Sequence, residues 1–329
     1  MKWQNKKVLV TGAGGFIGGH LTEKLVKLGA SVTAFIRYNS RGSHGSLELL
    51  SNDIRSQIKV VMGDLKDPDA VQKVVRSQEI VFHLAALIGI PYSYVHPIDY
   101  VQTNVLGTSY LVNACLSENI EKFIHTSTSE VYGTARYVPI DEEHPLQGQS
   151  PYSASKIAAD KLVESYYCAF KFPAAIIRPF NTYGPRQPSR AVIPTIISQA
   201  LKSDTIKLGA LSPTRDLNYV EDTVNGFLKV AEIPESVGEV INIGSSREIS
   251  IGDLAKKIFY LLDKSPRLIT EEERLRPEKS EVERLMANTD KAKKILEWTP
   301  QVSLDEGLKQ TIEWIKQNLS FYSTDTYHV

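Results

Sequence analysis

The sequence predicts an α/β fold in which a Rossmann-type doubly wound parallel sheet is followed by a smaller C-terminal α/β lobe. Short runs of Val, Ile, Leu and Phe alternate with amphipathic stretches over roughly the first 180 residues, as in strands that helices cover on both faces. A glycine-rich turn follows the first run, and proline and glycine become frequent after Pro179. We therefore expect a first domain over 1–180 and a second over 181–329, with some interleaving of segments.

Each apolar run is expected to form one strand of the sheet, and each amphipathic stretch one helix. The expected strands are, in order, KKVLVTG, SVTAFI, IKVVMGD, EIVFHLAA, EKFIHTSTS and FPAAIIRPF. Proline marks the start of helices at Asp67-Pro68, His96-Pro97 and Ser150-Pro151, the last with serine as a favourable N-cap. In the second domain, a capping box from Ser303 to Glu306 predicts the start of the last helix.

Composition and charge favour a globular protein that binds small molecules. The chain has 329 residues, 42% hydrophobic and 23% charged, with a formal net charge of zero. A nucleic acid or an anionic membrane is therefore not expected as a partner. No apolar run is long enough to span a membrane and no signal-peptide pattern is present, so we expect a cytoplasmic protein. Cys115 and Cys168 lack the spacing of metal ligands, so we expect two reduced core residues and no metal site.

The turn after the first strand has the spacing Gly12-x-x-Gly15-x-x-Gly18, with Phe16 and Ile17 inside it. The early glycines allow a tight turn beside a pyrophosphate, and the last lets the following helix pack close to its strand. Asp64 ends the third expected strand, where it can meet an adenine amino group. A strand before the turn and a helix after it favour a dinucleotide site over a turn without a ligand.

The end of the second strand leaves the choice between NAD and NADP open. NAD sites usually present a carboxylate there, whereas this chain has Phe35-Ile36-Arg37-Tyr38-Asn39. Arg37 can hold a 2′-phosphate, or it can be a solvated side chain stacked on adenine. This segment alone leans towards NADP without deciding the question.

A second motif, Tyr152-Ser-Ala-Ser-Lys156, is typical of a proton-transfer site. Positions i and i+4 of a helix share one face, so the phenol and the ammonium can reach the same pocket. A tyrosine with its ordinary pKa of about 10 is a poor base at neutral pH, but a nearby ammonium and a positive nicotinamide ring would lower that pKa. The spacing is common in ordinary helices and becomes informative because a dinucleotide fold precedes it.

Together with His83-Leu84-Ala85-Ala86, Asn104 and Thr128, these motifs resemble the extended short-chain dehydrogenase/reductases that modify nucleotide sugars. The resemblance runs from about residue 5 to about residue 318. It implies NAD as the cofactor, tightly bound and recycled, with NADP not excluded. The cofactor would contact Gly12, Gly15, Phe16, Ile17, Gly18, Arg37, Asp64, Leu65, Leu84, Ala85, Ala86, Asn104, Tyr152 and Lys156. It also implies a homodimer formed through a four-helix bundle by the helices near 97–118 and 152–171.

The same resemblance implies that the second domain binds a nucleotide sugar, with a UDP-linked sugar favoured. The substrate would contact Pro91, Asn181, Arg186, Val192, Pro194, Leu208, Arg215 and Arg276. Arginine suits a diphosphate because its forked donors match the phosphate oxygens. For any single arginine, a solvated position on the surface is an equally ordinary explanation.

The segment Thr128-Ser129-Glu130 bears on the type of reaction. By the resemblance, Thr128 and Tyr152 hold the 4-hydroxyl of the sugar, Tyr152 takes its proton, and hydride leaves C4 for the nicotinamide. The resulting ketone acidifies the C5 hydrogen, so a carboxylate at Glu130 is sufficient to move that proton. Relatives that remove water carry Thr-Asp-Glu here, and Ser129 departs from that pattern because a hydroxyl is a weak proton donor.

Several activities remain open at this point. The runs TSTSEVYGTA, SPYSASK and RPFNTYGPRQ are most similar to the NAD-dependent 4,6-dehydratases of legionaminic- and pseudaminic-acid-type pathways. A related reaction would oxidise C4 and reduce C6 of a 5,6-ene sugar, which needs no acid for a leaving group. Decarboxylation of a nucleotide-linked glucuronate and 4-epimerisation are alternatives, the latter leaving Glu130 without a role. A dinucleotide-binding scaffold without turnover is the alternative that is not an enzyme.

Overall fold

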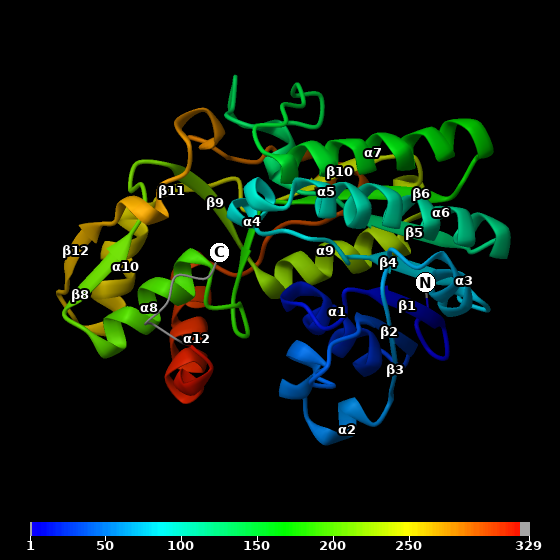
Figure 1. Ribbon diagram of the computed structural model, residues 1–329, viewed down its shortest axis with the longest axis horizontal. Helices are drawn as coiled ribbons and strands as arrows, with labels where there is room; N and C mark the ends of the chain where they lie inside the picture. Colours follow the sequence, from blue (N-terminus) through cyan, green and yellow to red (C-terminus); the bar gives the residue numbers. More distant parts are fainter. Residues whose placement is uncertain (1, 323–329) are drawn as a thin grey trace.

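The computed structural model describes residues 2–322, which contain a seven-stranded parallel sheet (Figure 1). The strands are β1 (Lys7–Thr11), β2 (Ser31–Arg37), β3 (Ile58–Gly63), β4 (Ile80–His83), β5 (Lys122–Thr126), β6 (Ala174–Pro179) and β10 (Val240–Ile243). Their order is β10-β6-β5-β4-β1-β2-β3, so the chain winds outwards in both directions from β1 and β4. The six expected strands are present and the predicted fold class is confirmed. The point where the order reverses is where ligands bind in such sheets.

Helices cover both faces of this sheet. One layer contains α1 (Phe16–Lys27) and α9 (Val220–Glu232), and the other contains α3 (Pro68–Val75), α6 (Gly107–Glu118) and α7 (Pro151–Phe170). Alternate residues of β1 face opposite layers, since Val8 and Val10 belong to one hydrophobic cluster and Leu9 to the other. This double coverage explains why the strands are nearly continuous in apolar residues.

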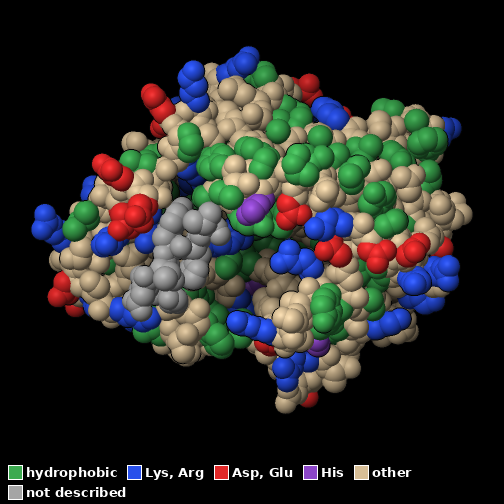
Figure 2. All heavy atoms as spheres, viewed as in Figure 1, with side chains coloured by type: hydrophobic (Ala, Val, Ile, Leu, Met, Phe, Trp, Pro, Cys, Tyr) green, Lys and Arg blue, Asp and Glu red, His purple; other side chains and the backbone are tan. Residues whose placement is uncertain are grey.

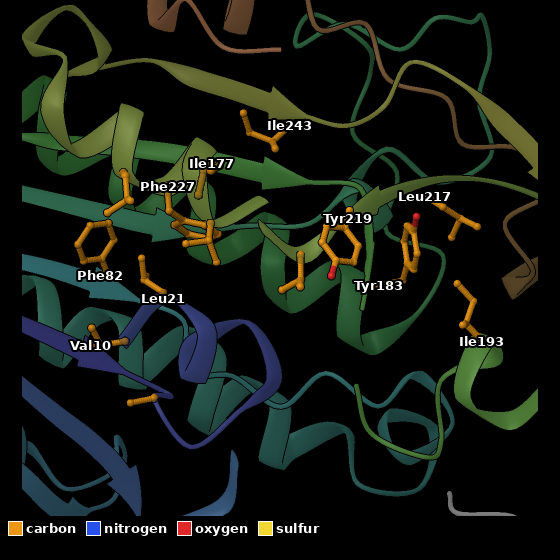
Figure 3. Close-up of a cluster of buried hydrophobic side chains, with 14 of the residues drawn as sticks. Val10, Leu21, Phe82, Ile177, Tyr183, Ile193, Leu217, Tyr219, Phe227 and Ile243 are labelled. Atoms are coloured by element: carbon orange, nitrogen blue, oxygen red, sulfur yellow. The ribbon is translucent and has the colours of Figure 1, made fainter. Parts of the chain in front are cut away.

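The second lobe consists of two small sheets and the helices packed on them. Its strands are β7 (Asn181–Tyr183), β8 (Thr205–Leu208), β9 (Thr214–Tyr219), β11 (Glu248–Ser250) and β12 (Arg267–Thr270), in the orders β11-β9-β7 and β12-β8. Its helices are α8 (Val192–Lys202), α10 (Ile251–Leu262) and α12 (Leu304–Gln317), whereas α11 (Asp290–Leu296) packs against β10 and α9 of the first lobe. Figure 3 shows that its side chains continue the core of the first lobe, from Val10 and Phe227 to Tyr183 and Ile193.

The helix starts follow the expected capping chemistry. Asp67 accepts hydrogen bonds from the first turn of α3, and Ser150 forms a full capping box with Ser153 at α7, where Pro151 opens the helix. Ser303 accepts the backbone N–H of Glu306 at the start of α12. These local contacts fix where the helices begin.

The helix expected near 97–118 is interrupted. It consists of α5 (Pro97–Tyr100), a π-helical segment η2 (Val101–Leu106) and α6. π-Helical turns are rare and often occur at functional sites, and this one carries the buried Asn104. The remaining short elements are η1 (Gly45–Leu49), α2 (Asn52–Arg55), α4 (Ile90–Val95), η3 (Ser129–Tyr132), η4 (Pro234–Ser236), η5 (Glu272–Arg274), η6 (Glu278–Ser280) and η7 (Leu319–Phe321).

Both cysteines are free thiols, but only one lies in the core. Cys115 is buried in α6 as expected, whereas Cys168 is exposed on α7, so the prediction of two core cysteines was wrong for Cys168. Over residues 2–322, no helix is long and apolar enough to cross a membrane. In the same residues, no cluster of His, Cys, Asp and Glu is arranged to hold a metal ion.

Candidate active site

The glycine turn between β1 and α1 lies directly against the segment that follows β4. Gly12 has a φ of 72°, and a Cβ added there would stand 2.7 Å from the backbone nitrogen of Ala85. A Cβ added at Gly18 would stand 2.2 Å from the carbonyl oxygen of Gly12. Neither position tolerates a side chain, so the glycines are required by close backbone approach as well as by conformation.

The first turn of α1 is suited to an anion. The helix begins after Gly15, which has no side chain to cap it, and continues with Phe16, Ile17 and Gly18, none of which carries a negative charge. The N–H groups of a first helical turn have no partner within the helix and lie at its positive end. The turn therefore fits the pyrophosphate of a dinucleotide.

The predicted adenosine contacts lie at the carboxyl ends of neighbouring strands. Arg37, the last residue of β2, pairs in register with Gly63 of β3, which directly precedes Asp64. Arg37 is exposed, and the Asp64 carboxylate accepts the backbone N–H of Lys66. Leu65 is buried and lies close to Gly107 of α6. These residues are close enough in space to form one end of a single site.

Asn104 holds the segment that follows β4 and lies against the glycine turn. Its amide oxygen accepts the N–H of Leu87 at 2.8 Å, and its amide nitrogen donates to the Leu87 carbonyl at 2.9 Å and to Ser155 Oγ at 2.9 Å. Leu84 and Ala85 donate their backbone N–H groups to Thr11. The segment Leu84-Ala85-Ala86 is thereby held beside the glycine turn and the start of α7.

The two residues of the Tyr-x-x-x-Lys motif are both buried on one face of α7. Tyr152 is 7% exposed and Lys156 is 4% exposed. Lys156 Nζ donates to the Thr126 carbonyl, at the end of β5, over 2.7 Å. Burial lowers the pKa of Lys156 to about 8, while the charge of Asp160 acts in the opposite direction. Lys156 therefore loses its proton at a pH closer to neutral than an ordinary lysine does.

The protein itself raises the pKa of the Tyr152 phenol, so the predicted lowering rests on the positive nicotinamide ring of the cofactor. Burial raises its pKa well above the ordinary value, the hydrogen bond with Thr128 opposes that change, and the charge of Glu130 reinforces it. Desolvation outweighs the favourable contacts within the protein because it penalises the charged phenolate. The same interactions place Tyr152, Thr128 and Glu130 in one site, as predicted.

Thr128, Ser129 and Glu130 lie where β5 passes into the short helix η3. Thr128 Oγ1 accepts the Glu130 N–H at 3.2 Å and so caps η3. Ser129 is 2% exposed, whereas Glu130 is only half-buried. The turn therefore places the Glu130 carboxylate, which is more accessible than Ser129, near enough to Tyr152 to affect its pKa.

The three predicted substrate arginines separate into two groups. Arg215 and Arg276 both approach one carboxylate, with Nη atoms 3.0 and 3.4 Å from Glu281 Oε1. Arg186 instead contacts α1, where Nη2 lies 2.6 Å from His20 Nδ1 and 2.7 Å from Glu23 Oε2. Arg215 and Arg276 thus converge on one point, whereas Arg186 joins the second lobe to the helix of the glycine turn.

The remaining predicted substrate residues are distributed around the second lobe and α4. Pro91 lies in α4, which packs against α7, and Val192 and Pro194 lie in α8, which packs against β8 and its buried Leu208. Asn181 begins β7, and its buried Oδ1 has no partner among the described residues. A buried acceptor of this kind usually has a partner, so it is suited to a ligand donor.

Arg190 was not singled out as a site residue by the sequence motifs. It lies in the turn before α8 and is exposed to solvent, yet its charge lowers the pKa of Tyr152 and interacts with Tyr100. Only Val192 and Pro194 from this part of the chain were predicted as site residues. Nothing in the local sequence distinguishes an arginine that acts on the Tyr152 phenol from one that faces bulk water.

A Rossmann sheet with this glycine turn, a buried Tyr-x-x-x-Lys pair and a second α/β lobe define the class of protein as an extended short-chain dehydrogenase/reductase. The model of the GDP-mannose 4,6 dehydratase family matches residues 9–311. The chain belongs to this family and is an enzyme of the extended short-chain dehydrogenase/reductase type.

Three relatives illustrate the range of reactions in similar proteins. The chain is 35% identical over 320 residues to the dTDP-D-glucose 4,6-dehydratase of Mus musculus, covering 95% of this chain and 89% of the relative. It is 34% identical over 323 residues to the UDP-N-acetyl-alpha-D-glucosaminuronate decarboxylase of Bacillus cytotoxicus, covering 95% and 98%. The UDP-glucuronic acid 4-epimerase of Bacillus cereus, solved with UDP-glucuronic acid and NAD, superposes with a TM-score of 0.86 at 31% identity, covering 95% and 99%. Because these similarities are nearly equal, overall identity does not select one reaction.

Proposed function

We propose that this enzyme converts a nucleotide-linked N-acetylhexosamine into a 4-keto-6-deoxy sugar nucleotide for nonulosonic acid synthesis of the legionaminic or pseudaminic type. It oxidises C4, transfers a proton at C5 and reduces C6, either as a 4,6-dehydratase or as a 4-oxidase/5,6-reductase of a 5,6-ene sugar. A UDP-linked substrate is favoured. The observation that supports the proposal is a carboxylate, Glu130, that lies with Thr128 near enough to Tyr152 to affect its pKa.

The residues around the glycine turn fit NAD. The first turn of α1 would bind the pyrophosphate, the segment Leu84-Ala85-Ala86 would flank the nicotinamide half, and Asp64 would meet the adenine. When bound, NAD supplies a hydride acceptor and donor and, while oxidised, a positive charge beside the phenol. Because the hydride returns to the same sugar, we expect the cofactor to stay bound to the purified protein.

The residues of the chain would handle the protons of the reaction. Tyr152 takes the proton of the 4-hydroxyl. Thr128 donates a hydrogen bond, and Lys156, one turn further along α7, supplies positive charge. Glu130 then removes or delivers the proton at C5, which the neighbouring ketone has made acidic. Ser129 can donate a hydrogen bond to a departing C6 hydroxyl, and Glu130, once protonated, is the nearest acid.

A substrate panel distinguishes the possible reactions. The purified protein is incubated without added cofactor with UDP- and GDP-linked N-acetylglucosamine, the 5,6-ene sugar and UDP-glucuronate. Loss of water, or conversion of the 5,6-ene at unchanged mass into a 4-keto-6-deoxy product, supports the proposal. Loss of carbon dioxide identifies a decarboxylase, and a product with only an inverted C4 identifies an epimerase. Either result overturns the proposal, and so does a protein that turns over only when cofactor is added and consumes it stoichiometrically.

Arg215 and Arg276 are proposed to bind the substrate diphosphate, and Glu281 competes for them. We expect Glu281→Gln to tighten UDP binding by about tenfold, a change of about 1.4 kcal/mol, because the partly buried carboxylate no longer pairs with Arg215 and Arg276. Glutamine keeps the size of the side chain while removing the charge. Isothermal titration calorimetry with UDP measures the change, with Glu283→Gln as an exposed control of equal charge. Unchanged or weaker binding would contradict the assignment of this pair.

We also propose a homodimer formed through α5, η2, α6 and α7. Exposed apolar side chains on these elements are Ile98, Val101, Leu106, Tyr167 and Phe170, and Figure 2 shows hydrophobic side chains gathered over this part of the molecule. We expect light scattering to give twice the chain mass of 36.7 kDa and Leu106→Glu to shift the protein towards the monomer. A monomeric wild-type protein would refute the proposal.

A further inference from the structure

A fully buried ion pair lies beneath the predicted catalytic residues. Asp160 of α7 is 0% exposed and Arg178 of β6 is 2% exposed. Arg178 donates from Nη2 and Nε to Asp160 Oδ2 over 3.1 and 3.2 Å. Buried ion pairs contribute little net stability, because the loss of hydration offsets the attraction. The role of the ion pair is therefore better judged from the groups that it contacts than from stability.

The ion pair holds both ends of residues 127–132, which form the catalytic segment. Ser127 Oγ donates to Asp160 Oδ2 over 2.6 Å. Arg178 Nη1 donates to the Tyr132 hydroxyl over 3.0 Å, and the guanidinium lies 5.0 Å from the centre of the Tyr132 ring. Ser127 directly precedes Thr128, and Tyr132 follows Glu130 by two residues. One carboxylate and one guanidinium thus fasten the chain immediately before and after the residues that act on the sugar.

Further contacts make this arrangement rigid. Lys156 lies one helical turn before Asp160, and the two hold the consecutive residues Thr126 and Ser127. The Tyr132 hydroxyl donates to Asn242 Oδ1 over 2.7 Å. The catalytic segment is therefore fastened to α7 on one side, and through Tyr132 to β6 and β10 on the other.

The ion pair also affects the protonation of its neighbours. Burial alone would raise the pKa of Asp160, but the adjacent His125 ring and the charges of Arg178 and Lys156 outweigh it and hold the pKa below its ordinary value. Burial lowers the pKa of His125 to about 4, so the ring is neutral at pH 7. The negative charge of Asp160 opposes the loss of the Lys156 proton.

We propose that Asp160 and Arg178 are positioning residues that set where Thr128 and Glu130 meet the sugar. Asp160 holds Ser127, which directly precedes Thr128, and Arg178 holds Tyr132, which lies two residues after Glu130. The ion pair thereby fixes the positions of Thr128 and Glu130. A displacement of about 1 Å at a reacting group can cost about a hundredfold in rate, so these contacts matter for turnover although neither touches the substrate. The division of roles between the two ends rests on the proposed function.

The test removes the two connections and leaves the ion pair in place. Substituting Asp160 or Arg178 itself would leave an unpaired buried charge and can prevent folding. Ser127→Ala deletes only the contact of Asp160 with the segment, and Tyr132→Phe deletes the hydroxyl that joins Arg178 and Asn242 while keeping the ring. Ser236→Ala and Tyr183→Phe are matched controls, because each removes a buried hydroxyl that donates to a backbone carbonyl far from the site.

The two variants should affect different steps. In Ser127→Ala, single-turnover oxidation at C4, followed by the absorbance of reduced nicotinamide, is expected to slow about tenfold. In Tyr132→Phe, exchange of the C5 hydrogen with solvent deuterium is expected to slow about tenfold while C4 oxidation changes less than about threefold. The KM for the sugar nucleotide and the bound cofactor should be unchanged in both, and the controls should retain wild-type rates.

Two results would overturn the inference. Wild-type rates in both variants would show that the segment holds its position without the pair. If both variants slowed C4 oxidation and C5 exchange equally, and only in proportion to a loss of thermal stability, the pair would have a general structural role. If the wild-type protein exchanges no C5 hydrogen with any sugar in the panel, the proposed function fails, whereas the Ser127→Ala effect on C4 oxidation still decides whether the pair positions Thr128.

Discussion

Tyr152→Phe is expected to lower kcat by about three orders of magnitude while leaving bound NAD in place. The phenol is the group proposed to take the 4-hydroxyl proton, and general acid–base catalysis contributes roughly 10²- to 10⁴-fold. Phenylalanine keeps the ring that packs edge-on against Tyr100 at a centroid distance of 6.2 Å. The fold and the nicotinamide side of the site should therefore survive.

The measurement compares kcat with the cofactor released from the denatured variant. Tyr166→Phe is the matched control, because this tyrosine lies on the same helix and its hydroxyl donates to Asn113 away from the site. A variant that turns over at the wild-type rate would remove Tyr152 from the mechanism. Loss of both turnover and bound NAD would assign it to cofactor binding instead.

Glu130→Gln should separate the two halves of the reaction. The amide keeps the shape of the side chain but cannot accept the C5 proton, so oxidation at C4 should proceed once per site and then stop. We expect kcat to fall by about 10²- to 10⁴-fold, with reduced nicotinamide accumulating in an amount equal to the sites. The variant also removes the charge that raises the pKa of Tyr152, so C4 oxidation should not slow.

Deuterium at C5 provides the second readout for Glu130→Gln. Wild-type protein in deuterated water should label C5 of the product, and the variant should not label the recovered sugar. Glu164→Gln, which changes an exposed carboxylate paired with Lys161 on α7, should behave as wild type. Full turnover in Glu130→Gln would favour 4-epimerisation, because that reaction has no use for this carboxylate.

Local sequence was sufficient for the elements whose physical cause is local. Apolar runs predicted the strands, and Asp67, Ser150 and Ser303 predicted helix starts because each caps a turn within three residues of itself. The interruption at Val101–Leu106 was not predictable in the same way. This π-helical turn carries Asn104, whose side chain contacts Leu87 and Ser155, and both partners are distant in the chain.

The residues proposed for the chemistry were predicted from short motifs, whereas contacts between distant segments were not. Tyr152 and Lys156 share one motif, and Thr128 comes from another and affects the pKa of Tyr152. That pKa also depends on how many atoms surround the phenol, which no motif reports, so its rise through burial was not predictable from the sequence. The carboxylate shared by Arg215 and Arg276 comes from Glu281, and Cys168 lies on the solvent side of a helix whose apolar residues extend over more than one face.

The last strand of the large sheet comes from the second half of the chain. β10 pairs with β6 and carries Asn242, the acceptor of the Tyr132 hydroxyl. A chain released from the ribosome after residue 180 would expose the backbone of β6 along an open edge, which invites association with other chains. Residues up to β10 must therefore be synthesised before the sheet on which α7 and its Tyr152 pack can close, and a gene split near residue 180 would separate strands of one sheet.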